Sequence, residues 1–156
     1  NRRSVVDEVV SEKDNPIGAM KSDAFEIILE IEPRDVNTFG IELDDLVIKY
    51  FVSDTVLTVY QKSQRQYKQN TRPLKPINNR IKLQILIDRT SYEIFGNDGR
   101  IAISSCYIPK TRDDQMETSI KFISSGGQMI IRRLEVNELK SIWDNYIFNL
   151  SELEIK

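Results

Sequence analysis

The stretch LQILIDRTSYEIFGNDGRIAI, residues 83–103, decides the fold. Apolar and polar residues alternate along it, and the alternation stops twice, at Asp88-Arg89-Thr90 and at Asn97-Asp98-Gly99. A period of two is typical of strands that bury one face, and Asn-Asp-Gly is a turn sequence whose glycine can take a positive φ. The stretch therefore predicts antiparallel strands joined by tight turns, with Asp88, Asn97 and Gly99 as turn-forming residues.

The same alternation recurs along most of the chain. In residues 24–33 the apolar side chains fall on one face and the glutamates mostly on the other, and Pro33 ends the strand. Further strands are predicted at residues 39–45, 46–52, 55–61, 80–88, 91–96, 100–108, 119–125, 127–139 and 141–143. Many short strands between Asn, Asp, Gly and Pro clusters indicate an all-β sandwich or barrel. Helical periodicity is weak: residues 4–13 fit a turn of helix or a strand, and residues 150–156 fit a turn or two of helix.

The composition is that of an ordinary globular domain. The chain has 156 residues, of which 40% are hydrophobic and 29% charged, enough for one domain with its own core. A net charge of −2 gives no field that would attract nucleic acid. The single cysteine, Cys106, excludes an internal disulfide, and no apolar run is long enough to span a bilayer. The chain starts at Asn1 and not at Met, so we expect it to be a piece of a longer polypeptide.

Most common reaction centres need residues that this sequence lacks. It contains no histidine, so Ser-His-Asp and Cys-His nucleophile systems are excluded and a zinc site is not expected. No glycine-rich phosphate loop has either common spacing, and SSGGQ at 124–128 is predicted to be a hairpin turn. Paired carboxylates can hydrolyse a glycosidic bond, but among 24 acidic residues some pair meets the spacing by chance. We predict neither a cofactor nor a metal.

The segment from Gln61 to Asn79 is basic, with five cations, two prolines, Tyr67 and no acidic residue. A basic segment that carries an aromatic residue can contact nucleic acid. Without an overall positive charge, a solvated connection between two sheets is the favoured interpretation.

The polar side chains within the segment 83–103 can be interpreted in two ways. In the structural one, Asp88 accepts backbone N–H groups at its turn and Glu93, on the following strand, forms an ion pair with Arg89. In the other, the same residues bind a ligand. Tyr92 and Glu93 are neighbours on one strand, so their side chains point to opposite faces and cannot both line one pocket.

The same residues resemble the C-terminal β-sandwich domain of glycoside hydrolase family 32, which includes invertases, levanases, inulinases and fructanases. The likeness is carried by Asp88–Ser91, Tyr92–Phe95, Asn97–Gly99 and Pro109, with Glu138–Trp143 as the closing strand. It implies a two-sheet antiparallel β-sandwich of the concanavalin A-like or jelly-roll type over residues 24–143. Residues 1–23 would then be a linker or first strand from a preceding domain, and residues 144–156 a C-terminal extension.

In that family, catalysis belongs to an N-terminal five-bladed propeller. Its motifs, (Trp/Met)-Asn-Asp-Pro-Asn-Gly, Arg-Asp-Pro and Glu-Cys, are absent from this sequence. The resemblance therefore implies that this chain holds no catalytic residue and that its partner is the propeller of the same polypeptide. It also implies a location outside the cytoplasm, either extracellular or periplasmic.

Three functions are consistent with these observations. The leading one is a non-catalytic domain that packs on and stabilises the propeller of an enzyme acting on fructans or sucrose. The second is a carbohydrate-binding module, in which Arg89, Glu93, Asp98 and Tyr107 would hold a fructan oligosaccharide. The third, a free-standing interaction domain, leaves the motif in residues 83–103 unexplained.

Overall fold

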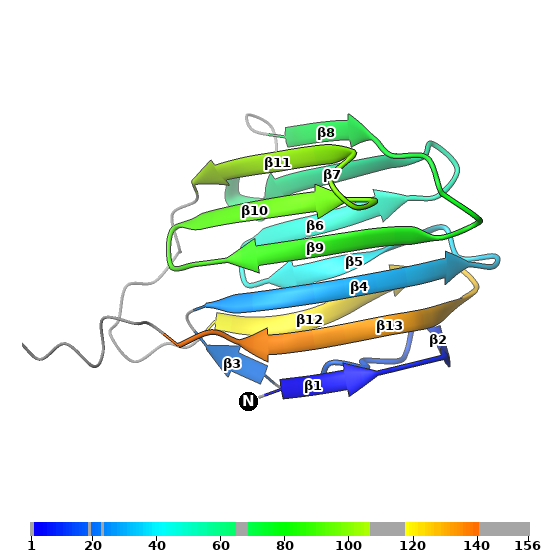
Figure 1. The fold of residues 1–156 in the computed structure, drawn as a ribbon, viewed down its shortest axis with the longest axis horizontal. Coiled ribbons are helices and arrows are strands. Elements are labelled where there is room, and N and C mark those ends of the chain that lie inside the picture. The colour runs from blue at the N-terminus through cyan, green and yellow to red at the C-terminus, as the bar shows by residue number, and fades with distance from the viewer. Residues whose placement is uncertain (1, 19, 23, 65–68, 107–117, 141–156) are drawn as a thin grey trace, which may run out of the picture.

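Two antiparallel sheets packed face to face form the molecule, which confirms the all-β sandwich (Figure 1). The computed structural model describes residues 2–18, 20–22, 24–64, 69–106 and 118–140. The seven-stranded sheet contains β1 (Arg2–Val5), β2 (Glu8–Ser11), β13 (Gln128–Glu138), β4 (Phe25–Pro33), β9 (Ile81–Ile87), β10 (Ser91–Gly96) and β11 (Ile101–Cys106). The six-stranded sheet contains β3 (Met20–Ser22), β12 (Thr118–Ser125), β5 (Thr38–Leu43), β6 (Leu46–Phe51), β7 (Val56–Gln61) and β8 (Gln69–Pro73). A 3-10 turn, η1 (Lys62–Gln64), follows β7.

Alternation in the sequence places one face of each central strand in the core. Along β4 every second residue is buried, and β9, its neighbour, shows the same pattern. Their registers bring apolar residues together, with Ile27 opposite Ile85 and Leu29 opposite Leu83. Fully burying such a side chain contributes about 1.5–3 kcal/mol. The structure therefore confirms these two predicted strands, and burial of their alternate apolar side chains is the physical reason that they form.

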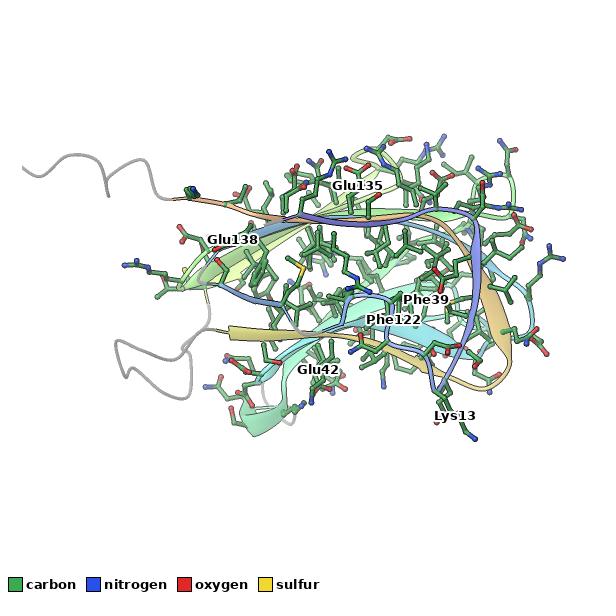
Figure 2. The ribbon with its side chains drawn as sticks, turned by 90° about the horizontal axis from the view of Figure 1, so that it is seen from below. Lys13, Phe39, Glu42, Phe122, Glu135 and Glu138 are labelled. Atoms are coloured by element: carbon green, nitrogen blue, oxygen red, sulfur yellow. The ribbon has the colours of Figure 1, made fainter. Side chains whose placement is uncertain are left out.

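Aromatic side chains fill the space between the sheets. Figure 2 shows Phe39 and Phe122 between the two layers, whereas Glu42 and Glu135 lie on opposite outer faces. The rings of Phe39 and Tyr50 are fully buried, with centroids 5.2 Å apart. The hydroxyl of Tyr50 donates to the carbonyl of Leu74 at 2.8 Å, and burial raises the pKa of Tyr50 to about 12. This bond fixes the start of the connection that carries the chain from β8 to β9.

Residues 126–127 lie at a corner between the sheets. The predicted hairpin is wrong, because the two glycines join β12 of the six-stranded sheet to β13 of the seven-stranded sheet. The corner is held by the connection between β4 and β5: the N–H of Gln128 donates to Oδ1 of Asp35 at 2.6 Å, and the N–H of Asn37 donates to the carbonyl of Ser125 at 2.9 Å. A local turn sequence cannot show in which sheet each flanking strand pairs.

The first part of the chain is extended. Residues 4–13, for which a helix or a strand was possible, contribute to β1 and β2, and both strands pair with β13. The predicted strand at 141–143, the helical turn at 150–156 and Tyr67 lie outside the described residues. In the part of the chain that is described, no helix has the length and apolar character needed to cross a membrane.

Candidate functional site

Residues 83–103 form three consecutive antiparallel strands, β9, β10 and β11, as predicted. The turn at Asp88 closes one end: its Oδ1 accepts the N–H of Arg89 at 2.7 Å, and its own N–H donates to the carbonyl of Ser91 at 2.9 Å. The turn at 97–100 closes the other end, and the φ of Gly99 is +85°, in the left-handed region. Both turns are therefore closed by local hydrogen bonds or by a left-handed backbone conformation.

Asn97 explains why the second turn begins with an asparagine. Its φ is 47°, in the left-handed region that Asn tolerates well, and its side-chain Oδ1 accepts the N–H of Lys82 at 2.9 Å. Its backbone N–H donates to the carbonyl of Lys82 at 2.8 Å, and its Nδ2 donates to the carbonyl of Lys75 at 2.8 Å. Although it is polar, Asn97 is 2% exposed, so these bonds satisfy a buried amide. One side chain thus joins the turn, β9 and the β8–β9 connection.

We expect Asn97→Ala to lower the free energy of unfolding by about 2 kcal/mol, because the part-buried N–H of Lys82 and carbonyl of Lys75 each lose a partner. Asp98→Asn, in the same turn, is the matched control and should change it by less than about 0.5 kcal/mol. Urea denaturation measures both. Equal stability of the two variants would mean that the Asn97 amide does not hold the turn.

The predicted site residues do not converge. Arg89 lies at the Asp88 turn, and Asp98 lies at the opposite end of β10, about 20 Å away for a strand of this length. Glu93 is exposed on the outer face of the sheet, and Tyr92 points into the core, as their alternation predicted. Tyr107 lies outside the described residues. The Arg89–Glu93 ion pair and the roles of these residues in sugar binding stay predictions.

A surface pocket of about 400 Å³ lies at the Asp98 end of the seven-stranded sheet. We call it the turn pocket; it is lined by Glu30, Ile77, Asn78, Arg80, Lys82, Asn97 and Asp98. Its lining residues come from β4, the start of β9 and the turn after β10, and these strands lie side by side in Figure 1. Sequence analysis missed Glu30, Arg80 and Lys82, because Glu30 lies on β4, 50 positions before Arg80, and only the pairing of β4 with β9 brings them together. The Asn78-Asn79 pair before Arg80 was a possible signal, since Asn-rich dipeptides mark tight turns.

Opposite charges alternate within the turn pocket. Nη1 of Arg80 donates to Oε1 of Glu30 at 2.8 Å, and Nζ of Lys82 lies 3.4 Å from Oδ2 of Asp98. The Arg80–Glu30 pair is the more shielded: the Glu30 side chain is 19% exposed, whereas that of Asp98 is 77% exposed. Two cations and two carboxylates leave the turn pocket formally neutral.

A second set of ion pairs continues across the outer face from the turn pocket. A bulge in β13 gives Arg132 no partner residue on β4, and its guanidinium binds Glu32 through Nη2 at 2.7 Å and Asp7 through Nη1 at 2.9 Å. The hydrogen bond from Arg132 lowers the pKa of Glu32, and the one from Arg133 lowers the pKa of Glu135. These carboxylates are stabilised in their charged form, which suits a structural role and not proton transfer near neutral pH.

The lowered pKa values predict loss of stability in acid. A carboxylate whose pKa is lower in the folded state contributes stability above its unfolded pKa, here near 4.5, and this is lost as the pH falls through the folded pKa. We therefore expect the melting temperature to fall below about pH 4.5 in low salt. Glu32→Gln should flatten this decrease, whereas Glu12→Gln, a change at an exposed site, should not. A Glu32→Gln profile identical to that of the parent chain would contradict this account.

Over residues 2–18, 20–22, 24–64, 69–106 and 118–140, no group of three or more His, Cys, Asp or Glu side chains is placed to hold a metal ion. The residues that line the turn pocket include no Ser, Thr, Cys or His.

Comparison with known proteins places the chain in a family. Residues 1–138 match the family model described as "Glycosyl hydrolases family 32 C terminal". Two levanases are similar in sequence: one from Bacillus sp. (strain L7) is 45% identical over 71 residues, covering 46% of this chain and 7% of the levanase. The other, from Bacillus subtilis (strain 168), is 36% identical over 73 residues, covering 47% and 10%.

Solved structures share the fold. The E230A fructofuranosidase from Schwanniomyces occidentalis, complexed with fructosylnystose, has a TM-score of 0.74 at 11% identity, over 90% of this chain and 33% of that one. An exo-inulinase from Aspergillus awamori has a TM-score of 0.69 at 18% identity, over 92% and 29%. The chain thus spans about a third of these proteins. Because the family model matches residues 1–138, the chain belongs to the family of C-terminal domains found in family 32 glycosyl hydrolases.

Proposed function

We propose that this chain is a non-catalytic domain that packs on and stabilises the catalytic propeller of an enzyme acting on fructans or sucrose. The observation that carries the proposal is the family match over residues 1–138, together with structural neighbours in which this fold makes up only 33% or 29% of a longer chain. A sandwich with its own core is well suited to serve as a rigid support for a second domain.

The two outer faces of the sandwich differ in charge. The outer face of the seven-stranded sheet carries many charged side chains, namely Arg2, Glu26, Glu30, Glu32, Lys82, Glu93, Arg132, Arg133 and Glu135. Among the described residues, the outer face of the six-stranded sheet carries few, and between them lie the half-buried side chains of Phe51, Val56 and Ile123, none of which belongs to the core between the sheets. Val47 and Tyr60 lie on the same face but are already buried in this chain. Interfaces between domains are depleted of charge at their centre and enriched in aromatic residues. The outer face of the six-stranded sheet is therefore the surface we assign to the propeller.

The chemistry of the chain supports the non-catalytic part of the proposal. The sequence has no histidine and none of the three propeller motifs of family 32. Its outer-face carboxylates Glu32 and Glu135 have lowered pKa values, whereas the general acid of a glycosidase needs a raised one. We also propose a location outside the cytoplasm, where polymeric fructans would be available to the enzyme.

The purified chain tests the non-catalytic assignment directly. Incubated with sucrose, levan or inulin, it should release no fructose above the rate of a heat-denatured sample. Turnover that survives repurification and is abolished by a single carboxylate-to-amide substitution in this chain would overturn the assignment.

A further inference from the structure

We propose that the turn pocket is a binding site for a neutral sugar, held through pairs of adjacent hydroxyl groups. This inference adds a binding function to the supporting role proposed above and does not depend on it. It rests on the way the walls of the turn pocket are fixed, on the arrangement of its charges and on one exposed apolar side chain.

Hydrogen bonds fix the walls of the turn pocket without any ligand. On one side, Ile77 and Arg80 exchange two backbone hydrogen bonds of 2.9 and 3.0 Å, which close a tight turn in which Asn78 and Asn79 have φ of 50 and 59°. On the other side, Asn97 is bonded to Lys82 and Lys75 as described above. Preformed walls reduce the conformational entropy that a ligand must remove on binding.

The charges of the turn pocket suit a ligand that both donates and accepts hydrogen bonds. A sugar hydroxyl beside the Arg80–Glu30 pair can donate a hydrogen bond to the Glu30 carboxylate, while the adjacent hydroxyl of the same sugar accepts one from the Arg80 guanidinium. The Lys82–Asp98 pair offers the same combination, and its side chains are 48% and 77% exposed, so both can reorient. An inorganic anion is a poorer match, because each cation already has a carboxylate beside it.

Ile77 supplies an apolar surface at the edge of the turn pocket. It is 36% exposed and does not belong to the core between the sheets. Sugars present C–H groups on the faces of their rings, and an exposed aliphatic side chain can cover such a face. A volume of about 400 Å³ is within the usual range of small-molecule sites, so the turn pocket can take a short oligosaccharide but not a protein segment.

Titration of the full 156-residue chain, followed by amide chemical shifts in NMR spectra, tests the proposal. The probes are a fructose trisaccharide, maltotriose and inorganic phosphate. We expect at least one of the sugars to shift the amides of residues 77–82 and 97–100, with a dissociation constant of about 1 mM, and phosphate to leave them unchanged. The two sugars distinguish a fructose-specific site from a general sugar site.

Matched variants locate the binding residues. Asp98→Asn should weaken sugar binding about tenfold, because a charged acceptor is lost from a highly exposed position where folding is not at risk. Glu93→Gln, on the outer face of the same sheet, and Asp88→Asn, at the opposite turn, should leave the affinity unchanged.

Three results would overturn the proposal. They are no shift with either sugar at about 50 mM, shifts of the same amides by phosphate, and sugar-induced shifts that map to residues 88–93. The last result would place the site at the residues that sequence analysis favoured. All of these measurements use this chain alone, so they are independent of whether it stabilises a catalytic domain.

Discussion

Gly40→Ala is expected to lower the free energy of unfolding by about 3–5 kcal/mol, which for a chain of this length lowers the melting temperature by roughly 10 °C or more. A Cβ atom at this position of β5 would lie 1.9 Å from the carbonyl oxygen of Ile48 and 3.0 Å from the Cα of Lys49. Both atoms belong to the backbone of β6, the neighbouring strand, so no side chain can move aside. Relief would require β5 and β6 to separate in the middle of the six-stranded sheet.

Gly99→Ala is the matched control for the Gly40→Ala variant. A Cβ atom at Gly99 would meet nothing within 4 Å, and its φ of +85° alone opposes the substitution. The expected cost is therefore only the conformational one, about 1–2 kcal/mol. Differential scanning calorimetry of the two variants measures the difference. A Gly40→Ala variant no less stable than Gly99→Ala would show that β5 and β6 do not approach so closely.

Phe39→Ala is expected to have an effect of similar size, about 3–5 kcal/mol. The side chain is fully buried between the sheets and its ring lies 5.2 Å from that of Tyr50, so its removal leaves a cavity and ends an aromatic contact. The cavity cannot refill easily, because the neighbouring strands are fixed by pairing with both of their neighbours. Urea denaturation gives the loss directly.

Phe51→Ala makes the same chemical change on the other face of the six-stranded sheet. Phe51 is half-buried, and its ring lies beneath the ammonium of Lys49, with 6.0 Å between Nζ and the ring centroid. We expect its truncation to cost about 1 kcal/mol in the isolated chain. If the Phe39 and Phe51 variants lost equal stability, the assignment of Phe39 to the core and Phe51 to the outer face would be contradicted.

Much of the fold was predictable because burial acts locally along each strand. The alternation of β4 and β9 predicted which side chains enter the core, and the Asp88 and Asn97 turns predicted where β10 begins and ends. The pairing of distant strands was not predictable in this way. Residues 126–127 have a typical hairpin sequence, yet they form a corner, because whether β12 pairs with β5 or with β13 depends on the whole arrangement of the sheets.

The candidate site was less predictable than the fold. Glu30 and Arg80 form an ion pair across 50 positions of sequence, and in the sequence alone nothing distinguishes them from the other acidic and basic residues of the chain. Asp98 was identified because it lies in a recognisable turn, but its companions come from β4, β9 and the β8–β9 connection. Only the pairing of β4 with β9, and of β9 with β10, brings these groups together.

Removing this domain from the polypeptide that carries it tests most directly whether it supports a catalytic partner. The measurement is the temperature at which fructose release from sucrose is lost on heating, with and without residues 1–140. The proposed function predicts that the shortened polypeptide inactivates several degrees lower, and that replacing Phe51 and Val56 by glutamate in the intact polypeptide shifts the temperature in the same direction. An unchanged inactivation temperature after removal of the domain would contradict the supporting role.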